Sequence, residues 1–332
     1  MAIHKPWWFS EDSVMVSTAP TCGLTKGGRL LPLIDRKTGN RVKVVDPETG
    51  GMVDAVNDRL LNDVEALLRG DTTDTLRFIP RGEISLRAAV PIYYDRRFDE
   101  AFHRAMDTER FEGFSSSTIG DLVRDGLIEV QNGHGSPSAD QRVGEVPYIK
   151  VSDLRAGLVN INPTNRVPYQ VAQKFWKGGR PDLQAFDILC PERTSKNIGD
   201  FCVLMPGQEQ VLLTKEIIVL RPGEKANFDS FYLLWAMTLK VVRDQWRRVV
   251  FMQTNREDVG KRYLEISIPI PDSKKIGDDA SLEFRNYFSM VAKARENLAS
   301  YLNDVGDHHF FVSGTEPPDE EEEGVAKAPS EE

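Results

Sequence analysis

Side chains that could hydrogen-bond to an anion or to a nucleobase gather in residues 249–263. Two amides and three cations surround Gly260: Gln253, Asn255, Arg256, Lys261 and Arg262. Amide side chains match the donor and acceptor edge of adenine, whereas arginine and lysine match guanine or a backbone phosphate. The pattern predicts a flexible loop that reads base edges in the major groove, with Tyr263 at its end as part of the contact set.

A second set of cations lies in a helix predicted over residues 229–248. Lys240, Arg243 and Arg247 recur at three- and four-residue spacing, which places them on one helix face. Such a face could follow the phosphate backbone of a duplex. An ordinary solvated helix face carries the same spacing, so both interpretations stay open.

A third group of hydrogen-bond donors occupies residues 193–197. Its members are Arg193, Thr194, Ser195 and Lys196, followed by Asn197. These side chains suit phosphates or base edges, and a plain polar turn has the same composition. The segment 176–180 (WKGGR) is a further, weaker candidate of the same kind.

The sequence offers no set of residues for catalysis or for metal binding. The five histidines are scattered, and neither a glycine-rich phosphate loop nor a Gly-x-Ser-x-Gly elbow occurs. Asp187, Glu192 and Lys196 come nearest to a metal-dependent nuclease, but the spacing from Glu192 to Lys196 does not fit its usual strand geometry. We therefore predict no catalytic residue and no metal site, and we expect that the chain is not an enzyme by itself.

The charge of the chain is unevenly distributed. The formal net charge is −9, and the residues from Thr315 onward contribute eight acids against Lys327 alone. Residues 141–275, in contrast, hold 21 lysines and arginines against 15 aspartates and glutamates, a net charge of +6. A basic module that could bind a polyanion is thus embedded in acidic surroundings, although surface charge also fluctuates this much by chance.

A mixed fold must position these side chains. Short apolar segments separated by Gly, Pro and Asn predict a strand-rich region from about residue 146 to 270. Two long helices are predicted, over 229–248 and over about 280–302, the second with near-heptad apolar spacing. A hairpin over 40–56 and a helix over 57–68 precede them. The expected fold class is α+β: a strand-rich domain with a long C-terminal helix, plus a small mixed N-terminal segment.

Composition points to a soluble globular protein. Hydrophobic residues make up 40% and charged residues 28% of the 332 residues, and the apolar runs are too short to cross a bilayer. The N-terminus lacks the apolar core of a secretory signal, so we expect a cytoplasmic location. Three cysteines at unrelated spacings indicate buried, inert thiols rather than a disulfide framework or a zinc site.

Five segments of the basic region occur in the order seen in a known family. They are 146–154 (VPYIKVSDL) with 157–160 (GLVN), 186–195 (FDILCPERTS), 218–222 (IVLRP), 231–235 (FYLLW), and 260–264 (GKRYL) with 268–271 (IPIP). Together they resemble the target-recognition domain of type I restriction-modification specificity subunits. The resemblance implies double-stranded DNA as a partner, and it adds Lys150 of the first segment to the DNA-binding set.

The first third of the chain resembles a different part of the same machinery. Residues 17–29 (STAPTCGLTKGGR) are similar to the segment that follows the catalytic domain of adenine-specific DNA methyltransferases. The Asn-Pro-Pro-Tyr-type motif and the glycine-rich turn of those enzymes are missing, however. The resemblance therefore implies a separate methyltransferase catalytic subunit, and it places S-adenosylmethionine on that partner rather than on this chain.

The resemblances imply four regions. These are a methyltransferase C-terminal-like segment (1–112), a DNA target-recognition domain (113–275), a spacer-like helix (276–312) and a disordered acidic tail (313–332). A full specificity subunit carries two recognition domains, whereas one is found here, so the chain reads a half-site or acts as a homodimer. A restriction subunit is a further partner that the resemblance leaves open.

The function expected from the sequence is sequence-specific recognition of double-stranded DNA in a modification or restriction system of phage defence. Two alternatives stay open. The chain could be the non-catalytic half of a split adenine DNA methyltransferase, or a protein-interaction subunit of a defence complex whose acidic tail mimics DNA or tethers a partner.

Overall fold

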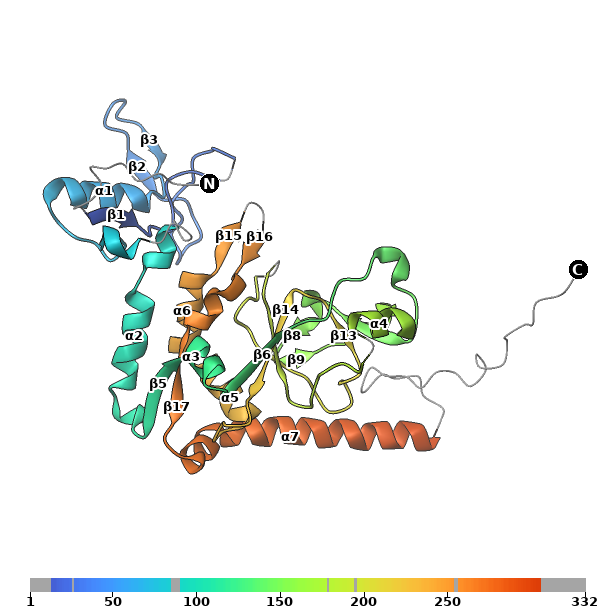
Figure 1. Cartoon of the computed structure of the whole chain (residues 1–332). Coiled ribbons are helices and arrows are strands. Elements are labelled where there is room, and N and C mark those ends of the chain that lie inside the picture. Colours follow the sequence, from blue (N-terminus) through green and yellow to red (C-terminus); the bar gives the residue numbers. More distant parts are fainter. Residues whose placement is uncertain are drawn as a thin grey trace, which may run out of the picture. The chain divides into compact units, whose positions relative to one another are not determined.

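The computed structural model describes residues 13–25, 27–84, 90–177, 179–193, 196–253 and 256–305, apart from the side chains of residues 252, 253 and 256 (Figure 1). The chain divides into two compact units, Met1–Arg97 and Phe98–Glu332, which we call unit 1 and unit 2. Of the predicted regions, the acidic tail (313–332) lies outside the described residues. No helix among the described residues has both the length and the apolar character needed to cross a membrane.

The described residues of unit 1 form two small antiparallel strand pairs and one α-helix. Strand β1 (Ser13–Ser17) pairs with β4 (Leu76–Pro80), and β2 (Lys43–Val45) pairs with β3 (Met52–Asp54). Helix α1 (Arg59–Arg69) begins where the Asp58 carboxylate accepts the Leu61 amide at 3.0 Å, and it ends at Gly70 with φ 76°. The predicted hairpin and the predicted helix of this segment are both confirmed. Two short 3-10 helices complete the unit, η2 (Arg81–Glu83) and η3 (Pro91–Tyr94).

Unit 2 holds the strand-rich region. Its main sheet has the strand order β6 (Ile128–Asn132), β14 (Ile217–Pro222), β11 (Ile188–Pro191), β12 (Cys202–Val203), β9 (Leu158–Val159) and β8 (Leu154–Arg155). A smaller sheet orders β10 (Arg166–Val167), β7 (Val146–Ile149) and β13 (Leu212–Leu213). Two further pairs are β5 (Phe114–Thr118) with β17 (Ser267–Pro271), and β15 (Phe251–Gln253) with β16 (Arg256–Asp258).

The helices of unit 2 surround these sheets. They are α2 (Arg97–Met106, which starts at the unit boundary), α3 (Ile119–Arg124), α4 (Tyr169–Phe175), α5 (Ser230–Thr238), α6 (Lys240–Val249) and α7 (Lys274–Val305). Short 3-10 helices are η4 (Glu109–Phe111), η5 (Ala139–Gln141), η6 (Val151–Asp153) and η7 (Gly260–Glu265). The expected α+β class, with a long C-terminal helix, is confirmed.

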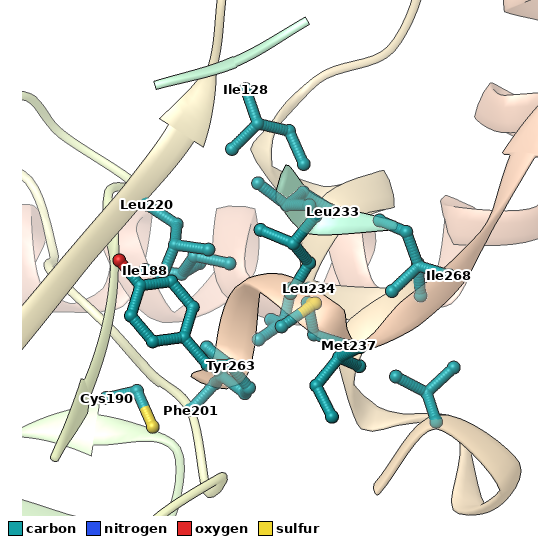
Figure 2. Close-up of a cluster of buried hydrophobic side chains, with 14 of the residues drawn as sticks. Ile128, Ile188, Cys190, Phe201, Leu220, Leu233, Leu234, Met237, Tyr263 and Ile268 are labelled. Carbon is teal, nitrogen blue, oxygen red and sulfur yellow. The ribbon is translucent and has the colours of Figure 1, made fainter. Parts of the chain in front are cut away.

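The main sheet is buried on both faces, which explains why β11 and residues 217–220 of β14 are continuously apolar. Ile188 and Leu220 belong to one core cluster and Leu189 and Val219 to another, because successive strand residues point to opposite faces. In the first cluster the side chains of α5 lie among the strand residues, as Figure 2 shows for Leu233. Phe288 of α7 is buried in the same cluster.

The helix predicted over 229–248 is wrong in one respect, because it is two helices. The backbone leaves helical geometry at Leu239, with φ −55° and ψ 134°, so α5 ends at Thr238 and α6 starts at Lys240. The Thr238 hydroxyl donates to the Leu234 carbonyl at 2.8 Å and thereby satisfies an acceptor at the end of α5. The break lets the mostly apolar α5 stay buried while α6 turns a polar face to solvent.

The prediction that all three cysteines are buried is also wrong. Cys190 and Cys202 are buried, whereas Cys22 is exposed. Burial raises the pKa of the Cys202 thiol to about 11 and that of Cys190 further still, so these two thiols are inert at neutral pH. The segment around Cys22 is held by single β-bridges rather than by strands, which leaves its side chain at the surface.

Candidate nucleic-acid interface

The predicted flexible loop over 249–263 is a β-hairpin followed by a 3-10 helix. Strands β15 and β16 pair in the register Phe251↔Asp258 and Gln253↔Arg256, and η7 follows. Phe251 and Val259 are buried and fix the base of the hairpin in the core. Of the predicted base-reading residues, Asn255 lies outside the described residues, and only the backbones of Gln253 and Arg256 are described.

Arg262 holds the hairpin at its base. Its Nε donates to the Val249 carbonyl at 2.9 Å, and its Nη2 donates to the Asp258 carbonyl at 2.7 Å. The guanidinium carbon also lies 3.9 Å from the centre of the Phe251 ring. These contacts join the residues before, within and after the hairpin, so Arg262 positions the hairpin in addition to any contact it makes with a ligand.

The two residues that flank Arg262 differ in exposure. Lys261 is exposed. Tyr263 is buried, and burial together with the nearby Glu192 carboxylate raises the pKa of its phenol to about 12. The Tyr263 ring therefore packs in the core, while Lys261 remains accessible beside the hairpin.

The predicted donor group at 193–197 lies directly against this hairpin. The backbone of Arg193 forms an antiparallel bridge with Asp258, and the Val259 amide donates to the Glu192 carbonyl at 3.0 Å. Lys196 is exposed in the turn that follows, and Thr194 and Ser195 lie outside the described residues. Two predicted site segments far apart in the sequence are thus adjacent in the structure.

Helix α6 joins the same region through the turn that ends at Asp200. Arg243 donates from Nε to Asp200 Oδ1 at 3.0 Å. Gly199 has φ 88°, and a Cβ added there would lie 2.8 Å from both Arg243 Nη1 and the Trp246 indole. The turn can pack this closely on α6 because a glycine occupies the position. The hairpin, the turn and α6 therefore form one continuous part of unit 2, which we call the hairpin surface.

The α6 cations are ion-paired with acids. Lys240, whose side chain is 86% exposed, pairs with Asp244, and Asp244 also lies 3.4 Å from Arg247 Nη2. Arg247 further lies 5.6 Å over the Phe98 ring. Arg248, in contrast, is 2% exposed and pairs with Asp99 at 3.1 Å and Glu265 at 3.0 Å, so it stabilises the fold.

Acids also accompany the cations of the turn. Arg193 Nη2 lies 3.8 Å from Glu192 Oε2, and its Nε lies 3.9 Å from Asp258 Oδ2. Burial raises the pKa of Glu192, and the neighbouring Asp258 raises it further while Arg193 opposes the shift. Sequence reasoning missed these acids, although Asp244 stands four residues after Lys240 and three before Arg247, the helix spacing of an ion pair.

Lys150 lies apart from the hairpin surface. It follows β7, and its Nζ lies 5.9 Å over the Tyr148 ring. Strand β7 pairs with β13, and Figure 1 shows β13 beside α4, across the main sheet from β15 and β16. The structure therefore brings together the predicted residues of the hairpin, the turn and α6, but not Lys150.

The residues that came nearest to a nuclease site have other partners. Asp187 is buried and accepts Arg221 Nε at 3.0 Å and Nη2 at 2.8 Å. Glu192 accepts the Asn132 amide at 3.2 Å. Within the described part of the chain, no group of three or more His, Cys, Asp or Glu side chains is placed to hold a metal ion.

No family model and no curated protein sequence matches the chain. Among solved structures, the type I restriction-modification S subunit from M. genitalium is 15% identical with a TM-score of 0.36, covering 69% of this chain and 55% of that one. The HsdS subunit from Thermoanaerobacter tengcongensis is 14% identical with a TM-score of 0.35, covering 59% and 43%. A chain from a structure of type I R-M complex assembly and conformational transition is 16% identical with a TM-score of 0.35, covering 74% and 65%. This chain therefore spans between 43% and 65% of the length of these three proteins.

Proposed function

We propose that this chain is the sequence-specific double-stranded DNA recognition subunit of a DNA modification or restriction system, working with a separate methyltransferase chain. One observation carries the proposal. The predicted base-reading segment is a hairpin whose base is bridged to Arg193 and fixed by Arg262, next to the cations of α6. A hairpin is narrow enough to enter the major groove, and neighbouring cations suit the phosphates at its edges.

The roles within the hairpin surface follow from exposure. Lys261, Lys196 and Lys240 are exposed and would contact phosphates. Gln253, the last residue of β15, and Arg256, the first residue of β16, would contact base edges together with Asn255, which lies between them in the sequence. Arg193 and Arg243 lie near the carboxylates of Asp258 and Asp200. When DNA binds, each arginine would leave its carboxylate and contact a phosphate instead.

A separate catalytic chain is supported by helix α1 of unit 1. Its large apolar residues recur at the spacing of one helix stripe and, whereas Ala66 is buried, these five are exposed: Leu60, Leu61, Val64, Leu67 and Leu68. A contiguous exposed apolar patch marks a surface that another molecule covers. We infer that the catalytic methyltransferase covers it, since unit 1 is the part of the chain that resembles a methyltransferase.

The orientation of α1 is fixed by a buried carboxylate. Asp63 accepts the Ser17 hydroxyl at 2.5 Å and the Thr75 hydroxyl at 2.7 Å, and the Thr73 hydroxyl also donates to it. Burial alone would raise the pKa of Asp63, but these hydrogen bonds lower it below its ordinary value. If α1 rotated to bury its apolar residues, the Asp63 carboxylate would lose these hydrogen-bond donors. The apolar stripe therefore stays exposed.

The partner would bring the chemistry. S-adenosylmethionine would bind to the catalytic chain, and a restriction subunit or a second copy of this chain would complete the assembly in the cytoplasm. Phage defence is the biological role that we propose for such a complex.

The test is selection of bound sequences from a random duplex pool at two salt concentrations, with the chain alone and with the methyltransferase chain added. An enriched motif in either arm is the expected result. Binding without any enriched motif in both arms would contradict sequence-specific recognition. Failure to bind duplex in both arms, together with stable binding to the methyltransferase chain, would instead favour a protein-interaction subunit.

A further inference from the structure

The basic charge of unit 2 is concentrated at some distance from the hairpin surface. Residues 142–180 hold seven lysines and arginines against two acids, a net charge of +5, whereas residues 181–275 hold 14 against 13. Nearly all of the excess positive charge therefore belongs to the segment that contains β7, β10 and α4. On the hairpin surface an acid lies beside each of four arginines, so this surface is close to neutral: Arg193, Arg243, Arg247 and Arg262.

Helix α4 turns one face to the core and the other to solvent. Ala172 and Trp176 are buried against Val146 and Leu212 of the smaller sheet. Besides Tyr169, the exposed side chains are two amides and three cations, at helix spacing and just beyond the helix end: Gln170, Gln173, Lys174, Lys177 and Arg180. We call these five residues the α4 surface; all of them can donate hydrogen bonds to phosphate oxygens.

The cations of the α4 surface differ from those of α6 in their partners. No carboxylate of the described residues lies within ion-pair distance of Lys174, Lys177 or Arg180. Lys240, Arg243 and Arg247 each have one. A phosphate can bind to the α4 surface without first displacing an acid, so this surface contributes more binding per cation.

Lys177 stands in an unfavourable backbone conformation. Its φ is 55°, directly after the end of α4, at a position where helices usually place glycine. The next two residues in the sequence are Gly178 and Gly179. The residue at the strained position is nevertheless a charged lysine and not a glycine. Lys177 thus adopts a conformation that costs it more free energy than it would cost a glycine.

We propose that the α4 surface binds the phosphodiester backbone of duplex DNA, as a second contact separate from the base-reading hairpin. The inference rests on the proposed function for the choice of duplex DNA as the polyanion. Figure 1 shows strands of the main sheet between α4 and the pair β15 and β16, so the two surfaces are spatially separate. The hairpin selects the sequence, and the α4 surface adds affinity that is equal for all sequences.

The test uses a triple variant of the full chain, Lys174→Gln, Lys177→Gly and Arg180→Gln. The Lys177→Gly change removes a charge and also relieves the backbone strain, so the unfolding temperature should not fall. Each lost phosphate contact should lower the slope of log affinity against log salt by about 0.9, hence by roughly 2.7 for three contacts. The triple change Lys274→Gln, Lys275→Gln and Lys293→Gln, which removes three exposed cations of α7, is the matched control.

The outcomes separate this inference from the proposed function. A reduced slope with the parent's sequence preference supports the α4 surface. An unchanged slope in a triple variant that still selects the parent's motif overturns the α4 surface and leaves the proposed function standing. A reduced slope in a protein that selects no motif supports the α4 surface and overturns sequence-specific recognition. A parent chain that binds no duplex at about 50 mM salt, either alone or with the methyltransferase chain added, overturns both.

Discussion

The guanidinium carbon of Arg262 lies 3.9 Å from the centre of the Phe251 ring and closes the base of the β15–β16 hairpin. The same side chain donates to the carbonyls of Val249 and Asp258, which precede and end the hairpin. A planar guanidinium can make both hydrogen bonds while it stacks on a ring, whereas a lysine ammonium cannot keep this geometry. The direction of the hairpin therefore depends on the shape of Arg262 as well as on its charge.

Replacing Arg262 by lysine should lower the free energy of unfolding by about 2 kcal/mol, because a charge-assisted hydrogen bond and the ring contact are lost. The salt dependence of duplex binding should stay the same, since the charge is kept, but the preferred sequence should weaken. Thermal unfolding and bound-sequence selection measure the two effects. Lys261→Gln, the adjacent control, should do the opposite: lower the salt slope and keep the preferred sequence. An Arg262→Lys protein with the parent's motif preference would contradict the positioning role.

Asp244 holds Lys240 and Arg247 in ion pairs on α6, so its removal should favour DNA. One unit charge about 4 Å from another is worth about 1 kcal/mol in water, so Asp244→Asn should raise duplex affinity roughly fivefold at low salt. The gain should be equal for all sequences and should vanish as salt screens the charges. Fluorescence anisotropy with two unrelated duplexes measures it. Glu283→Gln on α7 makes the same charge change elsewhere; an equal gain in that control would show that only net charge matters.

The sequence predicted the elements whose signals are local. The helix predicted over 57–68 is α1, whose ends in the structure are the Asp58 cap and Gly70. The strands around Ile188 and Ile218 were recognisable from continuous apolar runs between Gly and Pro. The break at Leu239 was not predicted, because the apolar spacing continues across it and only the different burial of α5 and α6 requires it.

The sequence predicted separate segments of the site, but it did not predict that the fold brings them together. The bridge between Arg193 and Asp258 joins segments that no local pattern connects. The structural role of Arg262 depends on Phe251, which lies on the first strand of a hairpin that was expected to be a loop. The outward orientation of the α1 stripe was equally hidden, since an apolar helix face normally predicts burial.

His134 should make the protein less stable in mild acid. Burial lowers the pKa of His134 to about 4, although Asp182 opposes the shift, and the neutral ring accepts the Leu213 amide at 3.0 Å. In the unfolded chain the histidine binds a proton near pH 6.5, whereas in the folded chain it stays neutral down to about pH 4. Its contribution to stability is therefore complete above pH 6.5 and is lost as the pH falls towards 4.

The size of this effect can be isolated by substitution. One pKa unit corresponds to about 1.4 kcal/mol, so the loss from His134 between pH 7 and pH 4 is on the order of 3 kcal/mol. His134→Gln keeps an acceptor for the Leu213 amide but does not titrate. Urea unfolding of both proteins at several pH values should show a smaller acid loss for the variant, while the carboxyl groups titrate equally in both. Parallel pH curves would contradict a buried, neutral His134.

The α1 stripe should be required for the catalytic chain and dispensable for folding. Leu61 and Leu68 have 51% and 81% of their surface exposed, so the double change Leu61→Ser and Leu68→Ser should alter the free energy of unfolding by less than about 1 kcal/mol. If the methyltransferase chain covers the stripe, the change should weaken that complex by at least about 2 kcal/mol, or roughly thirtyfold, and leave duplex binding by the chain alone unaltered. Calorimetric titration of the full chain with the methyltransferase chain measures the affinity. Val143→Ser, at an exposed apolar residue of unit 2, is the matched control, and a double variant that binds the methyltransferase chain as tightly as this control would exclude α1 from the interface.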